Sequence, residues 1–252
     1  MFVRRLTTSF KEQHWMTIVI ELVIVIVGVF IGNWVNDWSQ RRAADRETHD
    51  LLVELRPEMT RQRASMASIR DYLQVTADYA DVAFAGWRRD PAVSDAQFVV
   101  AAYQASQAYG LSANGQTWAE IFGGDQLRRI KNPAITTPLQ RLMTYDYSLL
   151  SYDRLNSKYR DQVRLIIPDD IQRRSRQSCG DRLILEGRGL ALPVSCPIAI
   201  PGAVAAAASL RLHPELVGKL AQHESLVATQ FTNVALVESQ IDLLDKAIAG
   251  LR

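Results

Sequence analysis

The chain has 252 residues, with 29 Lys and Arg against 27 Asp and Glu, and a formal net charge of +2. A charge so close to zero, with no basic stripe interleaved with aromatic residues, excludes the surface that nucleic-acid-binding proteins use. The length is enough for one folded domain, or two small ones, beside a membrane segment.

Residues 16–35 are predicted to form a transmembrane helix. Thirteen of these 20 residues are Ile, Val, Leu or Phe, and as a helix they rise about 30 Å, which matches the hydrocarbon core of a bilayer. They favour insertion by about 4 to 8 kcal/mol, more than the roughly 2.5 to 3.5 kcal/mol that one central acid costs. Trp15 and Trp34 flank the run and are predicted to anchor it at the headgroups.

Two alternatives to a transmembrane helix fit the sequence less well. A buried core helix rarely runs this long without a polar face. A cleavable signal peptide has a shorter apolar region and a small-x-small cleavage site, whereas the residues that follow this segment, "IGNWVNDW", are bulky. An uncleaved anchor in a lipid bilayer is therefore expected.

One acid and two glycines lie on the same side of this helix. On a helical wheel Val25, Gly28 and Gly32 fall within about 40° of Glu21. Small residues let another helix approach closely, and a carboxyl group is better satisfied against a helix than against lipid. We expect the Glu21 stripe (Glu21, Gly28 and Gly32) to contact another transmembrane helix, from a second copy or a different protein. The alternative is that Glu21 lies near the headgroups and the glycines are incidental.

The orientation in the membrane depends on weaker signals. Three basic residues precede the span and three follow it closely, so their counts do not decide. A short N-terminal tail and a long C-terminal part favour a cytoplasmic N-terminus. Cys179 and Cys196 both lie in the C-terminal part, and such a pair in a loop-rich stretch indicates a disulfide, which persists in the periplasm. Two unrelated free thiols are the alternative. We expect a bacterial inner-membrane protein with a periplasmic C-terminal domain.

The fold is expected to be mainly α. Residues 1–15 are a short cytoplasmic tail, and residues 36–57 a charged stalk helix that Pro57 kinks or interrupts. Residues 58–252 are a helical bundle with an irregular Pro- and Gly-rich excursion over 168–202. The apolar positions past Pro57 do not keep a strict heptad, so a long coiled coil is not expected.

Three longer helical stretches are predicted in this domain before the excursion, besides two short helices joined by a Gly-Gly turn in "QTWAEIFGGDQLRRIKN". The first begins at Glu58 and ends near residue 87, and the second covers 94–109 with Ser94 as its N-cap. The third runs from Pro133 to about residue 167 with Asn132 as its cap. The core positions predicted on the first are Met59, Met66, Ile69, Leu73, Tyr79, Val82 and Phe84.

Tyrosines on the third stretch recur every seven residues. Tyr145, Tyr152 and Tyr159 would share one buried stripe if the helix were continuous. The excursion that follows carries one short strand pair near "RLILEG". The last helix begins at His213–Pro214, and its predicted apolar stripe is Leu216, Leu220, Val227, Phe231, Val234, Ile241, Leu244 and Ile248.

No motif for catalysis, a cofactor or a metal is present. The chain has no P-loop, no dinucleotide-binding glycine pattern, no GxSxG, no HExxH and no CxxC. Its four histidines are scattered. His223–Glu224 is a poor metal site, because adjacent helical residues point in different directions. We predict a protein that is not an enzyme, with no catalytic, cofactor-binding or metal-binding residues.

Two stretches carry a resemblance. "ELVIVIVGVFIGNWVNDW", followed by an Arg-rich helix, and "TWAEIFGGDQLRRIKNPAITTPLQRLMTYDYSL" are similar to a family of uncharacterised bacterial single-pass membrane proteins. Phe122-Gly123-Gly124 departs from that family's Leu-x-Ser-Ser-Gly pattern. The resemblance implies a helical domain beside one transmembrane helix and implies no activity.

These observations favour a protein that acts by association, as a homo-oligomer or as an accessory subunit of a larger membrane complex. The alternative function is a ligand-binding sensor domain that signals through a membrane partner.

Overall fold

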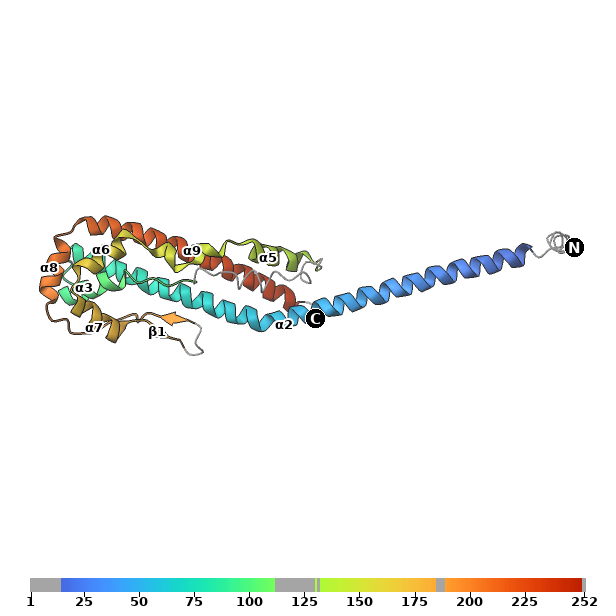
Figure 1. Cartoon of the computed structure of the whole chain (residues 1–252), viewed down its shortest axis with the longest axis horizontal. Coiled ribbons are helices and arrows are strands. Elements are labelled where there is room, and N and C mark those ends of the chain that lie inside the picture. Colours follow the sequence, from blue (N-terminus) through green and yellow to red (C-terminus); the bar gives the residue numbers. More distant parts are fainter. Residues whose placement is uncertain (1–14, 112–129, 131, 185–188, 251–252) are drawn as a thin grey trace. The chain divides into compact units, whose positions relative to one another are not determined.

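The computed structural model describes residues 15–111, 130, 132–184 and 189–250, and it confirms a mainly α protein (Figure 1). The chain divides into two compact units, Met1–Val53 and Glu54–Arg252, which we describe separately. Most of the expected cytoplasmic tail lies outside the described residues. So does the Phe122-Gly123-Gly124 stretch of the resemblance.

The first unit contains the start of helix α2, which runs from Trp15 to Trp87. The most apolar 18-residue window of its segment Trp15–Ala43 has a mean hydropathy of 2.6 and contains no buried residue. Within the described part of the chain, this is the one segment long and apolar enough to cross a membrane. It includes the expected span of residues 16–35. In lipid this run must be helical, because only a helix satisfies its backbone polar groups internally.

Helix α2 continues through Pro57, so the interruption expected there is wrong. A proline inside a helix costs about 3 kcal/mol, because it removes a hydrogen bond and crowds the preceding turn. In the second unit Met59 and Met66 are 1% and 0% exposed, and each such burial contributes roughly 1.5 to 3 kcal/mol. The packing of α2 therefore outweighs the defect at Pro57.

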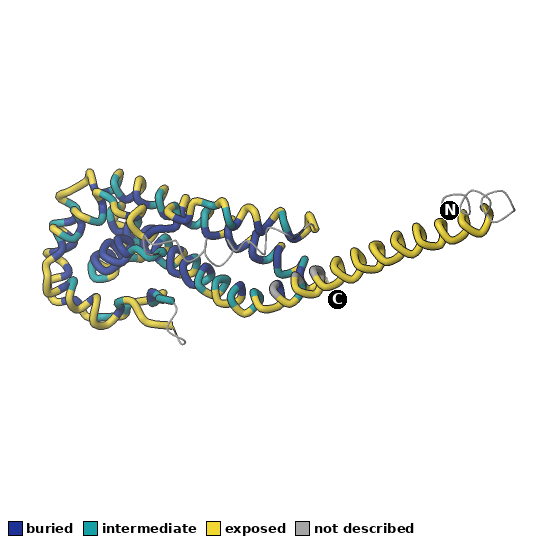
Figure 2. The backbone as a smooth tube through the Cα atoms, turned by 45° about the vertical axis from the view of Figure 1, so that its right-hand side comes forward, coloured by how far each residue is buried: buried dark blue, intermediate teal, exposed yellow. Residues whose placement is uncertain are grey.

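The second unit is built on two long antiparallel helices, the part of α2 from Glu54 onward and α9 (Glu215–Ala249), with α5 (Pro133–Thr144) packed along α9 (Figures 1 and 2). Seven of the eight predicted apolar positions on α9 are buried, whereas Phe231 is only partly buried. His223, Gln230 and Val237 complete the buried stripe. Its members recur alternately every three and four residues, as in a helix that packs along one side.

Helix α2 shows the same kind of spacing in the second unit. Five of the seven predicted core positions are buried, while Val82 and Phe84 are partly buried against the core. Met59, Met66, Leu73 and Ala80, all buried, recur every seven residues. The hydrophobicity pattern does not reveal this heptad, because the buried positions between its members include the polar Thr76.

Short helices form the opposite end of the unit from the end of α9 (Figure 1). They are α3 (Asp95–Gln104), α6 (Lys158–Ile166), α7 (Asp169–Cys179) and α8 (Ala203–Arg211). Ser94 caps α3 in a capping box, as predicted, although the helix ends five residues before residue 109. The ring of Trp87 lies edge-on to Phe98 at 5.0 Å between centroids. Trp87 also donates through Nε1 to the carbonyl of Leu210 at 3.3 Å, which joins α2 to α8.

The continuous helix expected over 133–167 is wrong. Asn132 caps α5 and Pro133 is its first residue, as predicted. The helix then ends at Thr144, and three shorter elements follow: the 3₁₀ helices η2 (Tyr147–Leu150) and η3 (Tyr152–Leu155), and then α6. Asp146, Ser151 and Ser157 each accept a backbone N–H through the side chain and so start a new element.

The predicted tyrosine stripe is lost with that helix. Tyr159 is fully buried and donates to the carbonyl of Ala102 at 2.7 Å. Tyr145 is only partly buried, and Tyr152 is 46% exposed.

The excursion over 168–202 is more regular than expected, because it begins with α7. A two-stranded antiparallel hairpin follows, in which β1 (Arg182–Leu183) pairs with β2 (Leu190–Ala191). A disulfide between Cys179 and Cys196, with a Cα–Cα distance of 5.6 Å, links the end of α7 to the chain after the hairpin.

Candidate functional site

The Glu21 stripe lies on a fully solvent-exposed part of α2. Glu21, Gly28 and Gly32 are all exposed. A Cβ atom built on either glycine meets no atom within 4 Å. The two glycines, one helical turn apart, therefore leave a shallow notch on the same side of the helix as the acid. A notch of this kind is what permits close approach between helices in a membrane.

The two predicted anchors, Trp15 and Trp34, are 60% and 70% exposed. A third tryptophan, Trp38, was not predicted as an anchor. The guanidinium carbon of Arg42 lies 4.1 Å from the centre of the Trp38 ring, a cation–π contact between an aromatic and a basic residue one turn apart. The spacing of four residues in "WSQRR" is the signal that identifies this pair.

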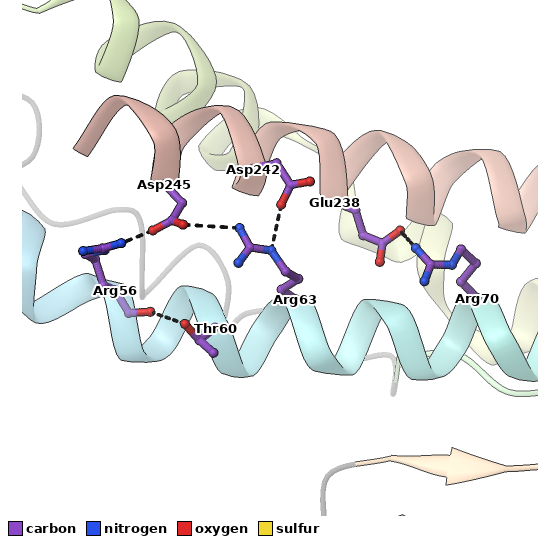
Figure 3. Close-up of polar contacts among 7 residues, drawn as sticks. All are labelled: Arg56, Thr60, Arg63, Arg70, Glu238, Asp242 and Asp245. Carbon is purple, nitrogen blue, oxygen red and sulfur yellow. Dashed lines mark hydrogen bonds and ion pairs between the residues drawn. The ribbon is translucent and has the colours of Figure 1, made fainter. Parts of the chain in front are cut away.

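In the second unit a ladder of ion pairs joins α2 to α9 (Figure 3). Arg56, Arg63 and Arg70 follow one another at intervals of seven residues on α2, and their partners on α9 are carboxylates. The nitrogen–oxygen distances are 3.0 Å from Arg56 to Asp245, 2.7 Å from Arg63 to Asp242 and 2.6 Å from Arg70 to Glu238. The ladder fixes the register of the helices and offers no free charge for a ligand.

A serine and a histidine meet in the interior. Oγ of Ser157 lies 2.9 Å from Nδ1 of His223, and the ring of Tyr159 stacks on the imidazole. His223 is only 1% exposed, and Ser157 also accepts the N–H of Arg160 as the N-cap of α6. A substrate has no access to an imidazole buried this deeply, so we assign the pair a structural role.

The same region gathers arginines around the end of α3. Arg160 and Arg164 of α6 both donate to the carbonyl of Ser106. Arg164 also donates to Oγ of Ser106 at 3.1 Å and to Oε1 of Gln107 at 2.9 Å. We call Arg160, Arg164 and Arg176 the arginine cluster.

Tyr103 connects the third arginine to the other two. The guanidinium carbon of Arg164 lies 5.2 Å from the centre of the Tyr103 ring. Nη1 of Arg176, on α7, is 3.4 Å from the hydroxyl of the same tyrosine. Burial, followed by the positive charges of Arg160 and Arg176, lowers the pKa of Arg164 from its ordinary value, with opposing contributions from the tyrosines.

No local sequence signal identifies this cluster, because its arginines on α6 and α7 meet residues at the end of α3 that lie more than 50 residues earlier in the chain. Within the described ranges, no group of three or more His, Cys, Asp or Glu side chains is arranged to hold a metal ion. Comparisons of the chain with protein-family models, with curated proteins and with solved structures give no match.

Proposed function

We propose that this chain is a non-enzymatic, single-pass protein of the bacterial inner membrane that acts by association through its membrane helix. It works as a homo-oligomer or as an accessory subunit of a larger membrane complex. The observation that carries the proposal is the Glu21 stripe, an acid and an open glycine pair on one side of an apolar, unburied helix.

Energetics support a helical partner for this stripe. Lipid tails are as apolar as Val or Ile, so helices associate in a bilayer through close packing and polar contacts. The notch at Gly28 and Gly32 supplies the close packing. Glu21 supplies a carboxyl that in hydrocarbon is costly alone and less costly when it shares a hydrogen bond with a neighbouring helix.

We also propose that the N-terminus is cytoplasmic and that the second unit is periplasmic. The pairing of Cys179 with Cys196 supports this orientation, because disulfides persist in the periplasm and are reduced in the cytosol. The resemblance to bacterial single-pass membrane proteins, which implies a helical domain beside one transmembrane helix, agrees with this arrangement. The lack of a catalytic motif and the inaccessible Ser157–His223 pair support a non-enzymatic role.

The decisive experiment changes the notch. Replacement of Gly28 and Gly32 together by isoleucine fills the notch and keeps the segment apolar, so insertion is preserved while close packing is lost. We expect the double variant to lose the oligomer or complex that the wild-type chain forms when native membranes are solubilised in mild detergent and run on a native gel. Copurification from the same membranes identifies the partner.

A matched control changes the other side of the helix. Val23 and Phe30 lie on the wheel opposite Glu21, so the double change Val23→Ile and Phe30→Ile alters side-chain volume away from the stripe. This control is expected to keep the wild-type complex. If the Gly28→Ile and Gly32→Ile variant runs at the wild-type position while inserted in the membrane, association through the stripe is wrong.

The alternative function, a ligand-binding sensor domain, is favoured by one specific observation, the arginine cluster.

A further inference from the structure

We propose that the arginine cluster is a binding site for a phosphate-type oxyanion. Its three guanidinium groups converge on the C-terminal end of α3 and the residues just after it: Arg160 and Arg164 contact the carbonyl of Ser106, and Arg164 and Arg176 contact Tyr103. This proposal is independent of the membrane association proposed above.

The positive charge of the cluster exceeds the negative charge that the described residues place beside it. Considering only the described residues, no carboxylate lies within 4 Å of Arg160 or Arg164. Among the described carboxylates, Arg176 pairs only with Asp169, at 3.7 Å, and shares it with Arg173. The end of a helix contributes only about half a negative charge, so capping of α3 does not balance three guanidinium groups.

The guanidinium groups also keep unused hydrogen-bond donors. Arg160 uses Nη1, and Arg164 uses Nε and Nη2, to reach acceptors among the described residues. Each guanidinium has five N–H groups, and the remaining N–H groups of both side chains meet no acceptor among the described residues, so they are available to a ligand. Both arginines are half-buried, where water competes less well than at an open surface.

This geometry selects the class of ligand. Planar guanidinium groups bind phosphate and similar oxyanions through paired N–H donors, and several arginines together bind a multiply charged anion better than a single charge. Tyr72, beside the cluster, stays neutral, because burial raises its pKa far above its ordinary value and the charge of Asp181 adds to this effect; its hydroxyl donates to Oδ1 of Asp181 at 2.7 Å. The ligand is thus a phosphate group, free or carried by a larger molecule.

The test measures thermal unfolding of the full chain in detergent micelles, with inorganic phosphate replacing chloride at constant ionic strength. A ligand that binds only the folded state raises the midpoint, and the stabilisation grows with the logarithm of the ligand concentration divided by its Kd. We expect phosphate to raise the midpoint of the wild-type chain above that in chloride. The Arg164→Gln variant should bind phosphate about tenfold more weakly or worse, because a charge-assisted contact is lost.

Two further variants keep the result interpretable. Arg176→Gln, at an exposed position, leaves the fold intact and is expected to weaken the phosphate response even if Arg164→Gln does not fold. Arg154→Gln changes an exposed arginine outside the cluster and should respond as the wild type does. The proposal is overturned if phosphate and chloride give the same midpoint, or if Arg164→Gln and Arg176→Gln respond like Arg154→Gln.

A second arm distinguishes a soluble phosphate from a lipid headgroup. The phosphate response is measured in nanodiscs of phosphatidylcholine alone and in nanodiscs that also contain phosphatidylglycerol. An equal response in both supports a soluble ligand, and a response abolished by phosphatidylglycerol supports a headgroup. The Gly28→Ile and Gly32→Ile variant should bind phosphate normally, so failure of one proposal is distinguishable from failure of the other.

Discussion

Nη1 of Arg70 on α2 donates to Oε2 of Glu238 on α9 across 2.6 Å, and only 12% of the glutamate side chain is exposed. The neighbouring ladder contact, from Arg63 to Asp242, is almost as short at 2.7 Å, but 51% of the Asp242 side chain is exposed. The two pairs have similar lengths and differ mainly in the solvent around the acid (Figure 3).

This difference predicts unequal contributions to stability. Exposed ion pairs contribute about 0.2 to 1 kcal/mol, and screening by solvent reduces the value further. We expect Glu238→Gln to lower the free energy of unfolding by about 1 kcal/mol and Asp242→Asn by only a few tenths. Denaturant unfolding of the full chain in micelles, followed by circular dichroism, measures both. Equal midpoints for the two variants would mean that burial of the acid does not determine how much each ion pair contributes to the free energy of unfolding.

A second prediction compares two glycines in helices. At Gly86 an added Cβ would overlap the ring of Phe98 and lie 2.7 Å from its Cβ atom, whereas at exposed Gly218 it meets nothing within 4 Å. Alanine improves helix propensity by about 0.5 to 1 kcal/mol at either position. Overpacking costs typically 1 to 3 kcal/mol in a tight core. We expect Gly86→Ala to lower the thermal midpoint and Gly218→Ala to raise it, and a rise in both would show that α3 moves away freely.

The features that the sequence predicted correctly are those with local signals. The apolar run of residues 16–35 is read from composition alone. The caps at Ser94 and Asn132 need only a side-chain oxygen placed two or three residues before a backbone N–H. Each of these signals lies within a few residues of its effect.

The predictions that were wrong or missing concern segments where side chains compete for backbone hydrogen bonds, or residues that meet only in the folded chain. The amphipathic pattern over 133–167 suits a helix, but the side chains of Asp146, Ser151 and Ser157 offer the backbone other hydrogen bonds. The buried stripe of α9 includes the polar His223 and Gln230, which a hydrophobicity pattern assigns to solvent. The arginine cluster depends on the folded chain bringing α6 and α7 to the end of α3, and no local pattern records that.

The disulfide gives a third prediction. Cys179 and Cys196 are 17 residues apart, and closing a loop of about this length in the unfolded chain contributes about 3 kcal/mol. We expect reduction with dithiothreitol to lower the free energy of unfolding of the wild-type chain by about that amount. The double change Cys179→Ala and Cys196→Ala is the control, since its midpoint should not respond to the reductant. A wild-type midpoint unchanged by complete reduction, verified by maleimide labelling after denaturation, would contradict a stabilising role.

The last prediction concerns acid. Burial lowers the pKa of His223 to about 4, and the positive charge of Arg160 adds to the effect, while the carbonyl of Ala105 opposes it. The histidine is therefore neutral in the folded chain at pH 5, whereas in the unfolded chain, with a pKa near 6.5, it is mostly protonated. The contribution of the neutral imidazole to the free energy of unfolding is fully present above pH 6.5 and is lost as the pH falls toward 4.

The size of this loss of stability follows from the shift in the pKa of His223. Each pKa unit corresponds to about 1.4 kcal/mol, so the folded chain loses about 3 kcal/mol through His223 by pH 4. His223→Asn places an amide near Ser157 that does not titrate, so this variant should lack that component of the acid sensitivity. The measurement is the free energy of unfolding at pH 7 and at pH 4 for both chains, because their difference removes the contribution of carboxylates common to both. If wild type and variant lose the same free energy of unfolding between pH 7 and pH 4, the imidazole is not held neutral in the core. Protonation of carboxylates then accounts for the acid sensitivity.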